Sequence, residues 1–351
     1  VSTAFADSQD VLRFFNWSDY IAEDTVEKFE KETGIKVVYD VYNSNEMLEA
    51  KLLTGRSGYD LVVPTSNFMG RQIQAKVFQP LNKEMLPNIK YLDTNLMNNI
   101  AVLDEGNKHG MPYLWGTIGI GYNVKQVKEA LGEDAPVDSW DLVFNPENMK
   151  KLASCGVSFL DSPIEIYPLA LLYAGMDVNS KKISDYKKES AAAKVLKDIR
   201  PYVHTFDSSA YNKLASGNIC IAVGYSGDML QAQSRAAEAE NGVEISYSIP
   251  KQGTSTQFDM LAIPSDAGNP VAAHKFINFL MRPEIIADIT NYVAYPNANT
   301  ESDKFQDPEI SNNPSIYPSD DIMKRLFTQD VLDSKSNKSL TRLWVDLKAG
   351  R

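Results

Sequence analysis

Short apolar segments alternate with amphipathic segments through the first hundred residues, and this rhythm constrains the fold most strongly. Residues 11–15 and 35–42 are typical of strands. Residues 59–64 form a continuous apolar run, as in a strand that is buried on both faces of a parallel sheet. Helical segments separate the three. The pattern therefore predicts a βαβαβ arrangement and an α/β domain.

Capping residues mark where the two intervening helices start and stop. Asp24, with Glu27 three residues later, predicts a helix start in which Glu27 bonds back to the cap. That helix is expected to end near Gly34. Ser44 predicts a second helix start, and Gly55 its end.

The length of 351 residues favours two domains, because a single hydrophobic core rarely serves so long a chain. Residues 109–123 are extended and glycine-rich, which is typical of a crossing between domains, and residues 243–250 are expected to carry the chain back. We predict two discontinuous lobes with a ligand cleft between them. Their expected bounds are 7–114 plus 250–306, and 115–249 plus 307–351.

The first six residues and the two cysteines bear on whether the protein is exported. Ala4-Phe5-Ala6 has the small-x-small form of a signal-peptide cleavage site, so residues 1–6 are expected to be a signal-peptide remnant on an exported protein. Cys155 and Cys220 suit one disulfide in that compartment, while two buried thiols would suit a cytosolic chain. Two cysteines are too few for a cysteine-based zinc site.

Charge and hydropathy exclude several partners. The net charge of −11 argues against nucleic acid and against an acidic membrane surface, and it is compatible with a cationic ligand. No apolar run is long enough to cross a bilayer.

Four carboxylates follow strand-like segments, the position at which open α/β sheets bind ligands. Each alone is more typical of a solvated carboxylate or a helix cap. Aromatic residues accompany them, and each ring alone is more typical of core packing. Together, carboxylates and ring faces suit an organic cation. The carboxylates are Asp19, Glu165, Asp228 and Asp259, and the rings are Trp17, Tyr20, Tyr225, Phe258 and Tyr295.

Signals for catalysis are weak. His109, His204 and His274 are scattered, and the sequence has no HExxH spacing, no Walker A loop and no GxGxxG after a strand. Residues 224–228 resemble a nucleophile elbow only superficially, because Asp228 replaces its last glycine. We expect a protein that is not an enzyme and that holds no cofactor and no metal.

Several segments in the same order resemble bacterial periplasmic polyamine-binding proteins, and the putrescine-binding branch most closely. The resemblance runs from about Val11 to the C-terminus. It is carried by residues 16–21, 30–37, 59–64, 119–123, 136–140 and 154–161. It implies a type II solute-binding fold in the periplasm, which closes on putrescine or a related polyamine and delivers it to the permease subunits of an ABC importer. A monomer is expected.

The resemblance also implies roles for individual residues. Carboxylates at the four positions given above would hold the two ammonium groups, Ser18 and Thr65 would add hydrogen bonds, and Cys155 would pair with Cys220. The implied ligand-binding residues are Trp17, Ser18, Asp19, Tyr20, Thr65, Glu165, Tyr225, Asp228, Gln257, Asp259 and Tyr295.

Three of these positions depart from the family pattern. Thr65 stands where the putrescine branch usually has Ser, and Tyr225 replaces a Trp of some members. Gln257 stands where an aromatic ring usually packs against the ligand. In place of a ring, Gln257 offers no apolar wall, and its amide can instead hydrogen-bond to an amine or a water. We therefore expect Gln257 to affect which length of ligand is bound.

Three alternatives remain open from the sequence. The first keeps the fold and changes the cargo to spermidine, agmatine or cadaverine. The second is an enzyme on a related scaffold that uses Cys155 as a nucleophile. The third adds a sensor role, in which ligand closure signals to a receptor.

Overall fold

The computed structural model describes residues 11–351 and divides them into two compact units. Unit 1 comprises residues 11–115 together with Phe258–Asn312, and unit 2 comprises Gly116–Gln257 together with Asn313–Arg351. The signal-peptide prediction for residues 1–6 lies outside the described residues. Among residues 11–351, no helix combines the length and the apolar character that a membrane span requires.

Unit 1 is built on a mixed sheet in the order β2-β1-β3-β9. β1 is parallel to β2 and to β3, and β9 is antiparallel to β3. The strands are β1 (Val11–Trp17), β2 (Lys36–Tyr42), β3 (Leu61–Val62) and the parts in this unit of β4 (Gly110–Asn123) and β9 (Thr254–Ala262). The helices are α1 (Thr25–Thr33), α2 (Asn45–Leu52), α3 (Ser66–Gln74), α4 (Thr94–Ile100), α12 (Pro270–Leu280), α13 (Pro283–Val293) and α14 (Pro308–Ser311). This confirms the predicted βαβαβ start.

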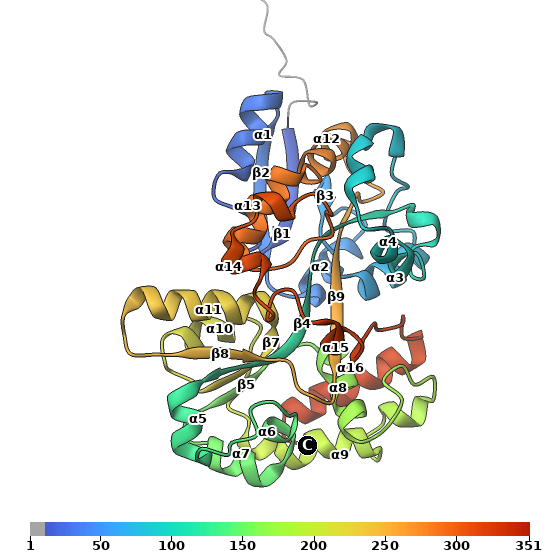
Figure 1. The fold of residues 1–351 in the computed structure, drawn as a ribbon. Coiled ribbons are helices and arrows are strands. Elements are labelled where there is room, and N and C mark those ends of the chain that lie inside the picture. Colours follow the sequence, from blue (N-terminus) through green and yellow to red (C-terminus); the bar gives the residue numbers. More distant parts are fainter. Residues whose placement is uncertain (1–10) are drawn as a thin grey trace, which may run out of the picture. The chain divides into compact units, whose positions relative to one another are not determined.

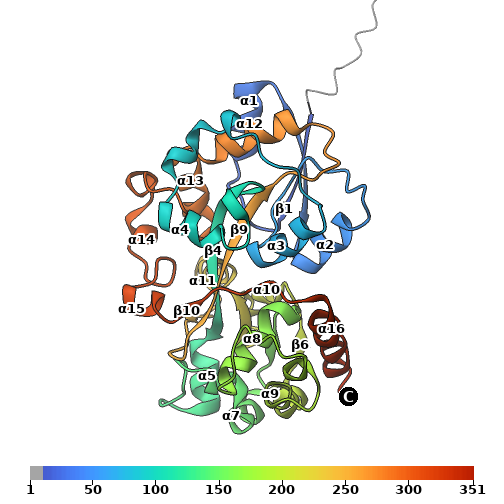
Figure 2. The same cartoon turned by 90° about the vertical axis from the view of Figure 1, so that its right-hand side faces the viewer.

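Aromatic residues join the sheet of unit 1 to the helices on one of its faces. Phe14 of β1 lies 5.1 Å from Phe276 of α12, measured between ring centroids, and Phe276 lies 4.7 Å from Phe29 of α1. All three are fully buried. Figures 1 and 2 show α12 and α13 on one side of these strands and α2 and α3 on another. The loops after β1 and β3 are thereby held at the carboxyl edge of the parallel strands.

Unit 2 has its own mixed sheet, in the order β4-β7-β5-β6, with β8 also pairing with β4. β7 and β8 are antiparallel to β4, and β5 is parallel to β6 and β7. The strands are β5 (Val157–Phe159), β6 (Thr205–Phe206), β7 (Ile221–Tyr225), β8 (Ile245–Ser248) and β10 (Leu326–Phe327). The helices are α5 (Val124–Leu131), α6 (Asp141–Phe144), α7 (Pro146–Leu152), α8 (Pro163–Tyr173), α9 (Ala191–Ile199), α10 (Ala210–Ala215), α11 (Ser226–Ala239), α15 (Asp320–Met323) and α16 (Ser334–Lys348).

The core of unit 2 gathers large side chains from α6, β5, α8 and α16, including Phe144, Phe159, Tyr167 and Trp344. α16 packs on α8 and α9, and Figure 1 draws it in red beside them. β10 pairs in parallel with β9 at Thr254 and Ser255. Residues 313–351 therefore complete unit 2 rather than form a separate tail.

Both helices begin where predicted, but two details of the prediction were wrong. α2 ends at Leu52, before the predicted Gly55. Ser44 caps α2 by accepting a hydrogen bond from the Met47 N–H at 3.2 Å, and Gly34 ends α1 in the left-handed region at φ 72°. Asp24 makes no side-chain cap bond. Its carboxylate instead pairs with Lys28 Nζ at 2.9 Å, one turn into the helix. The predicted capping box was therefore wrong, although the helix begins where expected.

The return crossing lies later in the chain than predicted. Residues 245–248 form β8, which pairs with β4 inside unit 2, and the chain passes into unit 1 along β9, between Gln257 and Phe258. The outward passage runs along β4, between Trp115 and Gly116. The predicted lobe bounds (7–114 plus 250–306, and 115–249 plus 307–351) stay a proposal for the two functional lobes.

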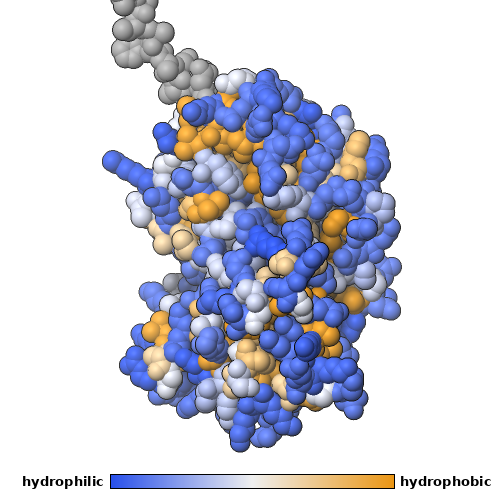
Figure 3. All heavy atoms as spheres, turned by 90° about the vertical axis from the view of Figure 1, so that its left-hand side faces the viewer, coloured by the Kyte–Doolittle hydropathy of each residue, from blue (hydrophilic) through white to orange (hydrophobic). Residues whose placement is uncertain are grey.

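The face of the molecule drawn in Figure 3 is predominantly polar. On the face drawn in Figure 3, hydrophilic residues surround the apolar areas. The large apolar side chains that are exposed, such as Val102 and Leu53, come from different elements.

Candidate functional site

The carboxyl end of β1 places the first group of predicted site residues. Trp17 is the last residue of β1, and its indole Nε1–H donates to Val63 O at 2.8 Å. The Ser18 N–H and Oγ both donate to Tyr42 O, at 2.8 and 3.2 Å. Asp19 turns the chain in the left-handed region at φ 53°, a conformation that Asp tolerates better than most residues, and it is exposed.

Aromatic rings from distant segments of unit 1 meet around Tyr20. Its ring lies 4.9 Å from Tyr295, at an interplanar angle of 84°, and 6.5 Å from Trp17. Tyr113 of β4 also contacts it edge-on and donates its hydroxyl to Tyr20 O at 2.6 Å. All four rings are buried. Three of them, Trp17, Tyr20 and Tyr295, were predicted to belong to the site, and the structure brings these three together.

Asp259 lies beside these rings and is the acidic centre of unit 1. Thr65 Oγ1 donates to its Oδ1 at 2.9 Å, and the Tyr20 hydroxyl donates to its Oδ2. Thr65 also forms a β-bridge with Asp259 and is oriented by Asn45, whose Nδ2 donates to Thr65 Oγ1 at 2.9 Å. Thr65, Tyr20 and Asp259 were all predicted site residues, and here they form one hydrogen-bonded group.

Burial shifts the protonation equilibria in this group. Desolvation raises the pKa of the Asp259 carboxyl to about 6, against the opposing effect of the hydrogen bonds from Tyr20 and Thr65. Desolvation also raises the pKa of Tyr20 well above its usual value, and the negative charge of Asp259 adds to that rise. Tyr20 therefore acts as a neutral donor to the carboxylate. A cation beside Asp259 would favour the ionised form of that carboxyl.

Glu165 is the acidic centre of unit 2. It lies in the first turn of α8 and is fully buried. Gln257 Nε2 donates to Glu165 Oε2 at 3.1 Å, and Gln329 Nε2 donates to the same oxygen at 3.3 Å. Gln257 Nε2 also lies 2.6 Å from Ser255 Oγ. A buried carboxylate with neutral amide donors offers a strong site for a positive charge.

Tyr225 and Asp228 occupy the end of β7 and the start of α11. Tyr225 is the N-cap residue and Asp228 lies in the first turn; both are partly exposed. A carboxylate in the first turn of a helix also interacts favourably with the helix dipole. Asp228 therefore has a structural role available to it besides ligand binding.

Phe258 does not join the ring cluster. Successive side chains of a strand point to opposite faces, so Phe258 projects away from the face that carries Gln257 and Asp259. It lies 6.2 Å from Trp115, measured between ring centroids. The prediction that Phe258 is one of the aromatic residues of the site is therefore corrected: Phe258 packs in the interior of unit 1.

Three comparisons with known proteins show which family the chain belongs to. Residues 24–318 match the family model described as bacterial extracellular solute-binding protein. The chain belongs to this family.

The alignments with relatives of this solute-binding protein cover nearly its whole length. The putrescine-binding periplasmic protein SpuD of Pseudomonas aeruginosa is 56% identical over 97% of this chain and 92% of its own. The putrescine-binding periplasmic protein PotF of Escherichia coli is 52% identical over 99% of this chain and 93% of its own. A solved structure of a spermidine/putrescine ABC transporter protein from Listeria monocytogenes superposes with a TM-score of 0.85 at 33% identity, covering 97% of this chain and all of that one.

These findings confirm the predicted type II periplasmic binding fold, the periplasmic location and the resemblance to the putrescine-binding branch. The predicted disulfide between Cys155 and Cys220 is also present. Because both cysteines are bonded, Cys155 offers no free thiol for the alternative in which it acts as a nucleophile. Among residues 11–351, no group of three His, Cys, Asp or Glu side chains is placed to hold a metal ion.

Sequence reasoning missed several residues of the two acidic centres of this solute-binding protein. Gln329 and Ser255 reach the Glu165 group, and Asn45 orients Thr65. Gln329 follows β10, and only the pairing of β10 with β9 brings it near Glu165. No local pattern indicates that pairing. Asn45 carried no usable signal either, because its burial shows only in the structure.

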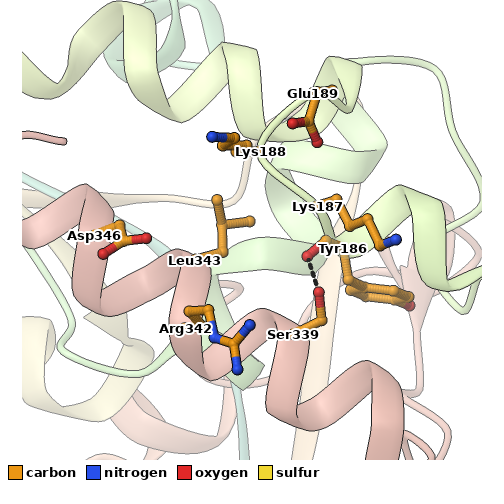
Figure 4. A pocket seen from close by; sticks show the side chains of 8 residues that line it. All are labelled: Tyr186, Lys187, Lys188, Glu189, Ser339, Arg342, Leu343 and Asp346. Carbon is orange, nitrogen blue, oxygen red and sulfur yellow. Dashed lines mark hydrogen bonds between the residues drawn. The ribbon is translucent and has the colours of Figure 1, made fainter.

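A separate pocket of about 240 Å³ lies in unit 2, between α16 and the segment after the short helix η5 (Ile183–Tyr186). Figure 4 shows charged side chains of both signs around Leu343, and Ser339 Oγ donating to Tyr186 O. The pocket contains none of the predicted site residues. It is lined by Tyr186, Lys187, Lys188, Glu189, Ser339, Arg342, Leu343 and Asp346.

Proposed function

We propose that this solute-binding protein captures a linear diamine in the periplasm, with putrescine as the first candidate, and delivers it to the permease subunits of an ABC importer. The observation that carries the proposal is the presence of one acidic centre in each unit: the partly exposed Asp259, which accepts hydrogen bonds from Tyr20 and Thr65, and the fully buried Glu165. A molecule with an ammonium group at each end is the simplest ligand for two such centres. The putrescine-binding names of two relatives, at 56% and 52% identity, support this choice.

Unit 1 would receive one ammonium group at Asp259. The charge would be held by the carboxylate, while Trp17, Tyr20 and Tyr295 present ring faces and edges to the methylene chain. A cation–π contact is worth about 0.5–2 kcal/mol per ring, whereas breaking a buried ion pair costs about 3–5 kcal/mol. The carboxylate would therefore set most of the affinity, and the rings would set the shape of the ligand.

Unit 2 would receive the other ammonium group at Glu165, with Asp228 as a second carboxylate and Tyr225 as a ring. Capture would follow from closure of the two lobes on the ligand, a motion known among binding proteins of this kind. Ser18, Asp19 and Thr65 would contribute hydrogen bonds or charge from unit 1. We also propose that the protein is a monomer and has no catalytic activity.

The test is isothermal titration calorimetry on protein that has been unfolded, washed free of ligand and refolded. Refolding is necessary because a tightly held amine survives purification. We expect one-to-one binding of putrescine, and at least tenfold weaker binding in Asp259→Asn and in Asp228→Asn, because each loses an ionic partner of the ligand.

A matched control is Asp288→Asn, which removes a carboxylate of unit 1 that is paired with Lys28 at 3.2 Å and lies outside the site. Its affinity for putrescine should equal that of the wild type. Wild-type affinity in Asp259→Asn would rule out its assignment as a ligand-binding residue. If protein shown to be refolded gives no heat of binding with putrescine, cadaverine, agmatine or spermidine, the proposed function is wrong.

A further inference from the structure

The side chain of Gln257 is enclosed in unit 2. It is 4% exposed and extends from β9 toward Glu165, which is 0% exposed, and Ser255, which is also 0% exposed. Its amide nitrogen donates to both neighbours, at 3.1 Å to Glu165 Oε2 and at 2.6 Å to Ser255 Oγ.

The hydrogen bonds fix which end of the amide faces the carboxylate. A carboxylate only accepts hydrogen bonds, so the group beside Glu165 Oε2 must be the NH₂ of Gln257 and not its oxygen. Oε1 of Gln257 therefore points to the other side of the amide. Within residues 11–351, this buried oxygen has no hydrogen-bond partner.

A buried carbonyl oxygen without a donor is destabilising, and a ligand that supplies the donor removes that cost. Such an oxygen also discriminates between ligands. A site built to accept a hydrogen bond rejects analogues that cannot donate one, because its polar group is then left unpaired. At this position an aromatic wall would instead have favoured methylene groups.

The acceptors around Gln257 favour a planar group with many donors. A guanidinium carries its N–H groups in a fixed fork that can engage a carboxylate and a neighbouring carbonyl at the same time. An ammonium is a compact point charge that reaches fewer acceptors in a fixed geometry. Agmatine combines such a guanidinium with an ammonium across four methylene groups.

We infer that Gln257 is a specificity-determining residue that admits a guanidinium at the Glu165 end of the ligand, so that agmatine binds at least as tightly as putrescine. This inference rests on the proposed function. Gln257 Nε2 holds Glu165 in place, and Gln257 Oε1 accepts a hydrogen bond from the guanidinium.

The structure supplies a matched pair of variants for the test. Gln257→Met and Gln329→Met each remove an amide N–H from Glu165 Oε2, but only Gln257→Met also removes the unpartnered carbonyl oxygen. Calorimetry on refolded protein would give the dissociation constants for putrescine, cadaverine and agmatine in each variant. Gln257→Phe serves as a second variant if Gln257→Met does not fold.

In the wild type, agmatine should bind at least as tightly as putrescine and at least tenfold more tightly than cadaverine. The preference for agmatine over putrescine should fall at least tenfold in Gln257→Met and change less than threefold in Gln329→Met. Equal losses for both amines in Gln257→Met, or agmatine more than tenfold weaker than putrescine in the wild type, would overturn the inference and leave putrescine capture intact. Failure of every amine to bind the wild type would overturn the proposed function as well.

Discussion

At Asp259, desolvation and hydrogen bonding act on one carboxyl group in opposite directions, and desolvation prevails. The two donors, Tyr20 and Thr65, do not bring its pKa back to the ordinary value, and it stays at about 6. The group is thus poised to bind either a proton or an organic cation. The hydroxyls keep the carboxylate oriented in both cases.

This competition predicts a pH dependence of binding. A proton on Asp259 must leave before the ammonium group binds, so affinity for putrescine should fall as the pH drops below about 6, by about tenfold between pH 7.5 and pH 5. Titrations at these two pH values would measure the change. Asp259→Asn should bind weakly at both, and an unchanged wild-type affinity at pH 5 would contradict the raised pKa.

The same shift has a consequence for ligand-free stability, with the opposite sign. The carboxyl has a higher pKa in the folded protein than in the unfolded chain, so its protonation contributes stability that is fully present below about pH 4. That contribution is lost as the pH rises through about 6. Binding and ligand-free stability therefore respond to acid in opposite directions at this residue.

Among the elements, β4 and β9 do most to place the site. β9 carries Gln257 and Asp259 two residues apart, on one face of the strand, so a single strand supplies a residue to the acidic centre of each unit. β4 approaches its neighbours so closely that side chains are excluded at Gly119. A Cβ there would lie 2.4 Å from Ser248 O of β8 and 2.5 Å from the Tyr247 hydroxyl.

Gly119→Ala should therefore destabilise the protein by about 1–3 kcal/mol, the usual cost of overpacking, because β8 must move away from β4. Thermal or urea unfolding of the refolded, ligand-free protein would measure it. Gly268→Ala is the matched control, since a Cβ there meets only Asp60 Oδ1 at 3.8 Å, an ordinary contact. Equal stability of the two variants would show that β4 and β8 can separate without cost.

Sequence patterns recovered these elements unevenly. Ser44 and Gly34 mark helix ends through local backbone chemistry, which the sequence carries directly. Residues 243–250 were expected to carry the chain back, but residues 245–248 pair with β4 inside unit 2 and the chain leaves along β9. Only the pairing partners of the two strands decide this. The sequence did not indicate Gln329 either, because the position of Gln329 beside Glu165 depends on the pairing of β10 with β9.

For the whole molecule, each unit has its own core and its own acidic centre. Placement after strand-like segments indicated Asp259 and Glu165 as candidates before any resemblance was considered, and the structure surrounds both with hydrogen-bond donors. The placement itself was wrong for Asp259, which lies inside β9 rather than after a strand. The sequence reasoning wrongly included Phe258, which contacts Trp115 instead. An aromatic residue next to a carboxylate in the sequence lies on the opposite face of a strand, and the sequence reasoning did not take this alternation into account. Residues 24–318 then match the solute-binding family as one continuous stretch that includes parts of both units.

The central claim is that both ends of the ligand are held by charge, one by Asp259 and one by Glu165. The most direct measurement compares putrescine with n-butylamine, which has the same four methylene groups and a single ammonium, by calorimetry on refolded protein. Loss of one buried ion pair corresponds to a loss of about a hundredfold or more in affinity, so putrescine should bind at least a hundredfold more tightly. Equal affinities for the two amines would mean that only one acidic centre meets the ligand, and would contradict the account.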